Sequence, residues 1–179
     1  PVALVVGLIH GDEHAGLRVV DRIEARADEL QGVQLWVIPS VNPDGARAHA
    51  RKSAHGVDLN RNFPYRWRGG LPHSDGYYPG PEPASEPETR AVDRLLAQVG
   101  FEFLVNYHSA AEGLLYGTGW QVATPTPDDA LYEALVGDPA SSAVPGYLPG
   151  LTADLYSGNG ILDEHAHIAY GTLGVTVEM

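Results

Sequence analysis

The chain has 179 residues, of which 44% are hydrophobic, so it is expected to form one globular domain. Its 23 Asp and Glu residues against 11 Lys and Arg residues give a formal net charge of -12, which argues against nucleic acid or an anionic membrane surface as a partner. No cysteine is present, which excludes disulfides, thiolate metal ligands and a cysteine nucleophile, and no apolar run is long enough to span a membrane.

Apolar segments near the start of the chain predict two strands joined by a helix. Residues 2–9 are almost continuously apolar, which is typical of a buried strand in a mainly parallel sheet. Residues 14–30 have helical spacing, and residues 33–38 form a second apolar run. The residues expected on the inner side of the helix are Leu17, Val20, Ile23 and Leu30. This strand–helix–strand order indicates an α/β protein.

A long irregular segment follows. Residues 39–83 are rich in Gly, Pro, Asn, His and Arg, and a stretch of this length inside a compact domain is usually functional or disordered. After it, Ser85 and Glu88 have the spacing of a capping box, with Ser85 as N-cap, which predicts a helix to about residue 99.

Two further strands are expected in the second half of the chain. Residues 101–107 form an apolar run that ends at His108, and residues 172–178 form the last strand. Between them we expect a short helix, a loop and a second helix, at residues 128–136, 139–160 and 162–170. No internal repeat or domain boundary is visible.

Side chains that can bind a metal follow the first strand. His10 would end the strand and Glu13 would lie on the first turn of the following helix, so both can reach one ion. Neutral imidazole and carboxylate are suitable zinc ligands, and Gly11 allows a tight bend between them. Taken alone, this pattern is more often a solvated loop at the end of a strand.

A second histidine ends another strand. The carboxyl ends of parallel strands collect functional groups at one edge of an α/β sheet, so His108 is expected near His10. Alone, His108 would more often be a hydrogen-bonded structural residue. Together with His10 and Glu13, it favours a site of two imidazoles and one carboxylate, which leaves a fourth position for water on a catalytic zinc ion.

Residues 56–64 carry several polar groups that serve recognition. Asn60 and Arg61 offer a planar set of donors for a carboxylate. Asp58 can accept the free ring N–H of a zinc-bound histidine. The alternative is a loop stabilised by Asx turns, which suits Asp58 and Asn62 individually but does not explain the whole group.

Glu178 ends the last apolar strand. An acid at this position lies either at the functional edge of the sheet or at a chain end. If it faces the zinc site, Glu178 can take a proton from a water molecule and pass it to a leaving amine.

Together these segments resemble the zinc carboxypeptidases of the carboxypeptidase A type. The matching segments follow the family's order along the whole chain, at residues 9–16, 42–45, 51–52, 56–64, 106–109 and 176–179. The form of residues 10–13 and of residues 84–91 is more similar to bacterial members such as murein peptide amidases, which cleave a bond beside diaminopimelate.

The resemblance implies the fold and the activity. The expected fold has three α/β/α layers around a central mixed, mostly parallel, twisted sheet. The expected activity is hydrolysis of the C-terminal peptide bond of peptides with a free C-terminal carboxylate, with one Zn²⁺ per chain. Because the chain is much shorter than the digestive carboxypeptidases, residues 1–179 are expected to be a single catalytic domain that is cut at one or both ends.

The resemblance also implies the catalytic centre. His10, Glu13 and His108 are similar to the zinc ligands, and Glu178 is similar to the general base and acid. Asp58 resembles the carboxylate that orients the first zinc histidine.

Other positions resemble residues that contact the substrate. Arg51 is similar to the arginine that polarises the scissile carbonyl, with Arg47 as a competitor for this role. Asn60 and Arg61 resemble the pair that grips the terminal carboxylate. Tyr156, 22 residues before Glu178, resembles the mobile tyrosine that closes over the substrate.

Asp163 falls on the position that lines the family's pocket for the C-terminal side chain. An acid there would favour a basic or diaminopimelate-like terminal residue. The alternative is that Asp163 only begins a helix, since acids favour the first turn.

Two other functions are compatible with parts of the pattern. A zinc-dependent N-acyl amino acid deacylase of the aspartoacylase or succinylglutamate desuccinylase type would share both zinc histidines and the Asn-Arg pair. A zinc-binding pseudoenzyme that only binds peptides would be expected to lack Glu178. The remaining histidines, among them His14 and His49, are expected on loops or exposed faces and not as metal ligands.

Overall fold

A computed structural model describes residues 1–117 and 126–179. In this part of the chain, six strands form one sheet in the order β2-β1-β3-β8-β4-β7. These strands are β1 (Val2–Val6), β2 (Gln34–Ile38), β3 (Phe103–His108), β4 (Gly113–Tyr116), β7 (Leu148–Leu151) and β8 (Leu173–Glu178). Strands β2, β1, β3 and β8 are parallel, whereas β4 runs antiparallel to β8 and parallel to β7. The sheet is therefore mixed and mostly parallel, as predicted.

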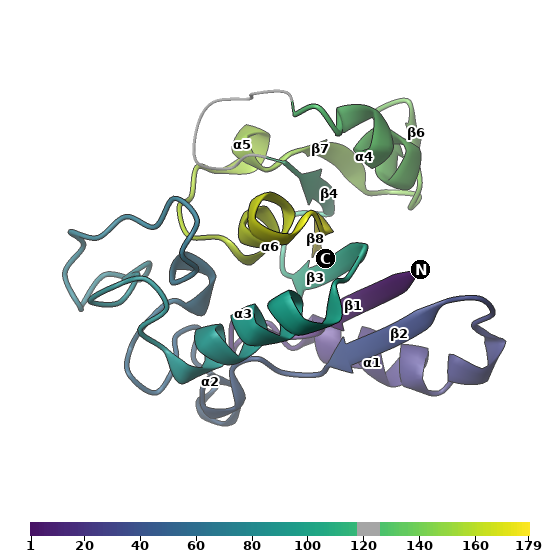
Figure 1. Ribbon diagram of the computed structural model, residues 1–179. Helices are drawn as coiled ribbons and strands as arrows, with labels where there is room; N and C mark the ends of the chain where they lie inside the picture. The colour runs from purple at the N-terminus through teal and green to yellow at the C-terminus, as the bar shows by residue number, and fades with distance from the viewer. Residues whose placement is uncertain (118–125) are drawn as a thin grey trace.

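Helices lie on both faces of this sheet. They are α1 (Ala15–Glu24), α2 (Pro43–Ala48), α3 (Pro87–Val99), α4 (Asp129–Val136), α5 (Thr152–Leu155) and α6 (Leu162–Tyr170). Two short 3-10 turns, η1 (Ala27–Glu29) and η2 (Leu59–Arg61), and a two-stranded ribbon of β5 (Gly137–Asp138) and β6 (Ser141–Ser142) complete the elements. Figure 1 shows α3 and α6 in front of the sheet and α1 behind it, which gives three layers. None of the described helices is long and apolar enough to cross a membrane.

The main core fills the space between the sheet and the layer of α3 and α6. It combines strand residues such as Leu4 and Leu104 with Leu96 of α3 and Leu162 of α6. Because alternate residues of a strand share a face, the buried residues of β3 form one row that continues from Leu104 to His108. The core therefore extends directly into the edge of the sheet where the polar residues lie.

Element boundaries differ from the predictions in the first helix. The helix α1 ends at Glu24 instead of continuing to residue 30, and only a 3-10 turn follows it. Leu30, predicted on the inner side, is 45% exposed. The apolar spacing therefore continued past the true end of the helix.

Two strands at one side of the sheet were not predicted. Strand β7 lies inside residues 139–160, which were expected to be a loop, and β4 had no assigned structure. Strand β7 contains Pro149 and Gly150, which weaken any strand pattern in the sequence. Proline is tolerated there because β7 is an edge strand of the sheet.

The start of α3 also differs from the predicted capping box. The helix begins at Pro87, its N-cap is Glu86, and no side chain caps it. Instead, Ser85 Oγ donates to Glu86 Oε1 at 3.0 Å and accepts a hydrogen bond from Asn62 Nδ2 at 3.0 Å. Ser85 therefore helps to fasten the irregular segment, and proline at the first helical position supports the start of α3.

The side chain of Asn62 ties the middle of that irregular segment to its end. Its Nδ2 donates to the carbonyls of Pro79 at 2.7 Å and Glu82 at 3.1 Å, and its Oδ1 accepts from the backbone N–H of Glu86 at 3.1 Å. The residue is fully buried. A single amide thus satisfies several backbone groups that have no helix or sheet to bind them.

We expect Asn62→Ala to lower the free energy of unfolding by about 2 kcal/mol or more, because it leaves buried backbone groups without partners. Urea unfolding followed by circular dichroism measures this loss. Gln98→Ala, which removes an amide from the exposed surface of α3, is the matched control and should change stability little. Equal stability of the two variants would contradict the structural role of Asn62.

Candidate metal centre

Three side chains converge at the carboxyl edge of the parallel strands. His10 Nδ1 lies 2.9 Å from Glu13 Oε1, His108 Nδ1 lies 2.9 Å from Glu13 Oε2, and the two Nδ1 atoms are 3.2 Å apart. Two ligands of a tetrahedral zinc ion are separated by about 3.3 Å, given metal–ligand distances of about 2.0–2.1 Å. The two imidazoles and the carboxylate therefore fit one zinc ion, and they form a group of possible metal ligands.

The backbone explains how residues distant in sequence meet there. Strands β1 and β3 are parallel neighbours, so the turn after β1 lies beside His108 at the end of β3. Within this turn Gly11 packs so tightly that an added Cβ would lie 2.1 Å from Gly45 C and 2.4 Å from Ala50 O. Only glycine fits that contact. Glu13 lies in the turn before α1 rather than on its first turn, which corrects the expected position.

Other buried groups hold the far side of each imidazole. Asp58 is fully buried, and because its carboxylate can only accept, His10 Nε2 donates to Asp58 Oδ1 at 3.1 Å. His108 Nε2 lies 3.0 Å from Asn106 Nδ2 and 3.4 Å from Asn60 Nδ2. These contacts fix both rings so that each Nδ1 faces Glu13.

No role was predicted for Asn106 from the sequence. The available signal was its position two residues before His108, which places both side chains on the same face of β3.

The charges in this cluster are mutually compensated. Burial acts to raise the pKa of Glu13, but hydrogen bonds with His10 and His108 hold that pKa well below its ordinary value. Burial acts to lower the pKa of His10, but hydrogen bonds with Asp58 and Glu13 outweigh it and raise that pKa. The carboxylate ligand is therefore ionised, as metal binding requires.

Arg51 joins the two carboxylates of the centre. Its Nη1 donates to Glu13 Oε1 at 3.2 Å, and its Nη2 donates to Asp58 Oδ2 at 2.9 Å. The competing Arg47 is mostly exposed and pairs with Asp44 on the surface of α2. Of the two arginines, only Arg51 reaches the metal ligands.

A cavity of about 740 Å³ opens over the three ligands. Glu178 lies in its wall at the end of β8, directly paired with His108 in the sheet register. Burial raises the pKa of Glu178. The cavity thus places a second, largely buried carboxyl group beside the metal ligands.

Two tyrosine rings contact a second arginine side chain in the wall of this cavity. The guanidinium of Arg61 lies 5.5 Å from the ring centroids of both Tyr77 and Tyr156. Tyr77 also lies 5.3 Å from Arg51, so it contacts both arginines of the cavity. Tyr77 was not predicted from the sequence, because nothing in residues 65–80 indicates that this irregular segment folds back over the site.

Of the residues predicted to bind the substrate, Asn60 and Asp163 do not line the cavity. Asn60 is fully buried, and its Oδ1 accepts from the backbone N–H of Leu162 at 2.9 Å. Asp163 lies in the first turn of α6 and packs against β8, where it accepts a hydrogen bond from Thr176. Asp163 Oδ1 has no partner among the described residues, and burial raises the pKa of this carboxyl group.

Comparison with known proteins adds independent information. A family model described as zinc carboxypeptidase matches residues 1–178. The catalytic chain of human carboxypeptidase N is 30% identical over 180 aligned residues, which cover 75% of this chain and 39% of that protein. Murein peptide amidase A from Escherichia coli K12 is 32% identical over 117 residues, which cover 59% of this chain and 48% of that protein. The chain therefore spans less than half the length of either relative.

The fold is also similar to a solved structure. Carboxypeptidase A from Helicoverpa armigera superposes with a TM-score of 0.85 at 21% identity, covering 100% of this chain and 52% of that one. This likeness confirms the predicted three-layer fold.

We expect His108→Ala to lower bound zinc from one ion per chain to a small fraction, because two ligands remain where three converge. Zinc content after dialysis, measured by atomic absorption, checks this expectation. His55→Ala removes a mostly exposed imidazole that binds Glu86 and should keep the full zinc content. Retention of zinc by His108→Ala would remove that residue from the ligand set.

Proposed function

The chain belongs to the zinc carboxypeptidase family, and from this premise we propose that it hydrolyses the C-terminal peptide bond of peptide substrates. One observation carries the proposal: Glu178, Arg51 and Arg61 line the same cavity as the three zinc ligands. One bound peptide could therefore contact a general base, a donor to the developing oxyanion and a cation that binds its terminal carboxylate.

The chemistry follows from these positions. A zinc ion held by His10, Glu13 and His108 would lower the pKa of a water molecule and polarise the scissile carbonyl. Glu178 takes the proton of the attacking water and returns it to the departing amine. Its buried position beside the cavity supports this role, because a raised pKa brings a carboxyl group closer to the pH at which it can exchange protons.

Arg51 is suited to hold the oxygen of the scissile carbonyl. Three of its contacts go to Glu13 and Asp58, which fix the guanidinium plane. A guanidinium has five N–H donors, so donors are left over for a substrate oxygen. A pre-positioned donor of this kind stabilises negative charge that develops during the reaction.

Arg61 is suited to bind the terminal carboxylate. Its Nη1 donates to the carbonyl of Asn60 at 2.7 Å, and the rings of Tyr77 and Tyr156 hold its guanidinium. We propose that Asn60 acts by positioning, since it links His108 to the start of α6, and that Tyr156 closes over the bound residue. This arrangement would place only the last peptide bond at the zinc ion.

The side-chain preference depends on Asp163. Its buried carboxyl group has one oxygen without a partner in the described structure, and a cationic side chain that reached it would supply that partner. We therefore propose a preference for a basic or diaminopimelate-like terminal residue. Its position outside the cavity wall requires the side chain to extend beyond that wall.

A deacylase of the aspartoacylase or succinylglutamate desuccinylase type is the alternative function. It would use the same zinc ligands but would act on N-acyl amino acids. The family match and the irregular segment that encloses the cavity favour a peptide substrate.

We expect Glu178→Gln to keep its zinc ion and to lose about 10²–10⁴-fold in kcat, because the amide cannot take up a proton. Steady-state hydrolysis of a peptide with a free C-terminus, together with zinc analysis, checks both parts. Glu133→Gln, an exposed substitution on α4, is the matched control. Near-normal turnover in the Glu178 variant would refute the assigned role.

Substrate class is tested with peptides that differ only in the C-terminal residue, each in free and amidated form, beside a set of N-acyl amino acids. We expect cleavage of the free peptides alone, with lysine or diaminopimelate preferred. Asp163→Asn should lower kcat/KM for these cationic residues at least about tenfold and leave a terminal phenylalanine nearly unaffected. Cleavage of the N-acyl amino acids instead would favour the deacylase function. An equal loss of kcat/KM for all peptides in Asp163→Asn would show that Asp163 does not determine the side-chain preference.

A further inference from the structure

Two histidines outside the zinc centre meet at the junction of α1 and α2. His14 is the N-cap of α1, and His49 is the C-cap of α2 in a left-handed conformation with φ of 50°. His14 Nε2 lies 3.1 Å from His49 Nδ1, and the ring centroids are 5.0 Å apart. These residues are 35 positions apart in the chain, and neither was expected to bind a metal.

The spacing of the two nitrogens suits a shared metal ion. It is close to the 3.2 Å between His10 Nδ1 and His108 Nδ1 in the zinc centre. It is also close to the separation of about 3.3 Å for two nitrogens on a tetrahedral zinc ion. A simple N–H···N hydrogen bond between two neutral rings has the same length, and metal titration separates these two states.

The backbone around the pair is held firmly. Gly11 packs against Gly45 inside α2 and against Ala50 just after the C-cap of α2, and its N–H donates to the carbonyl of Arg51 at 3.3 Å. This contact joins the turn that precedes His14 to the segment that carries His49. The two segments that carry the imidazoles are therefore fixed to each other, which lowers the free-energy cost of bringing both rings to one ion.

We propose that His14 and His49 form a second, weaker site for a divalent transition metal such as Zn²⁺, with water as the remaining ligands. Imidazole nitrogens suit zinc, nickel and copper, and the net charge of -12 favours a cation at the surface. The bound ion would connect the segment of Glu13 to the segment of Arg51, which already contact each other at 3.2 Å. The site therefore braces the zinc centre from outside without contributing a ligand to it.

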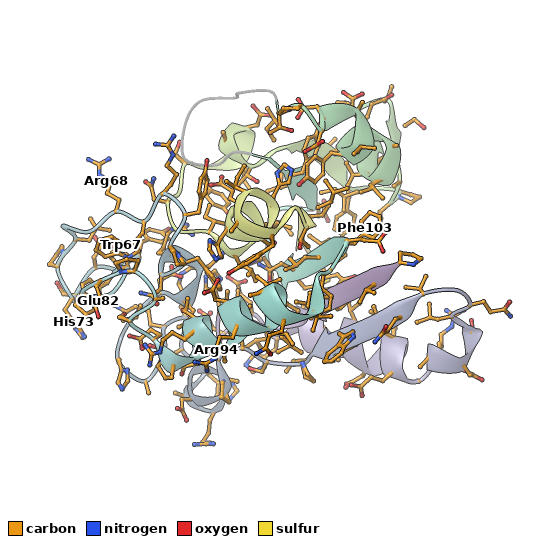
Figure 2. All side chains as sticks on the ribbon, in the orientation of Figure 1. Trp67, Arg68, His73, Glu82, Arg94 and Phe103 are labelled. Atoms are coloured by element: carbon orange, nitrogen blue, oxygen red, sulfur yellow. The ribbon has the colours of Figure 1, made fainter. Side chains whose placement is uncertain are left out.

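The test uses zinc-loaded protein dialysed against increasing free zinc, with bound metal measured by atomic absorption. The expected result is a second equivalent in the wild type that is lost in both His14→Gln and His49→Gln. His73→Gln is the control, because His73 is an exposed imidazole on the irregular segment, which Figure 2 shows away from α2. That variant should keep both equivalents.

The first equivalent reports whether each variant is correctly folded. If His14→Gln also loses the first equivalent of zinc, because Glu13 is adjacent, the result for His49→Gln decides whether the second site exists. In addition, the ring signals of both histidines should shift with the second equivalent in nuclear magnetic resonance spectra. A wild-type chain that stays at one equivalent, or a second equivalent that survives in His49→Gln, overturns the proposal and leaves a surface hydrogen bond.

Discussion

The carboxylate of Glu13 is the group on which the polar edge of the sheet depends. Burying a carboxylate is costly unless other groups replace the water that it loses. Here two imidazoles, the guanidinium of Arg51 and the backbone N–H of Ser109 all approach it, at distances between 2.9 and 3.2 Å. These groups come from the turn after β1, from the segment after α2 and from the end of β3, so one side chain fixes the relative positions of three parts of the fold.

The strand ends were the part of the site that could be predicted from sequence. His10, His108 and Glu178 each follow or end an apolar run, and parallel pairing of β1, β3 and β8 brings such ends to one edge. The helix predicted at residues 162–170 also matches α6. Apolar runs carry information about the strands because they report burial, and burial is what pairs the strands of a sheet.

The other residues of the site are held by contacts that produce no periodic pattern in the sequence. Asn62 and Tyr77 act from an irregular segment through hydrogen bonds and ring contacts across long separations. The neighbours Asn60 and Arg61 lie on one tight turn, yet the first is fully buried and contacts α6 while the second faces the cavity. Sequence spacing could suggest that the pair acts on a substrate, but only the structure separates the buried member from the open one.

The amide of Asn62 has a consequence for how the cavity can change. It ties residues near 79–86 back to the end of η2, so residues 64–78 form a closed excursion whose base is secured independently of its tip. The tip supplies residues 68–71 and Tyr77 to the cavity wall, while the zinc ligands belong to the sheet. Surface excursions tolerate substitution and length changes far better than sheet edges do. Selection can therefore reshape the entrance to the zinc ion by altering residues 64–76 alone, with Tyr77, its contacts with Arg51 and Arg61, and the chemistry behind them left intact.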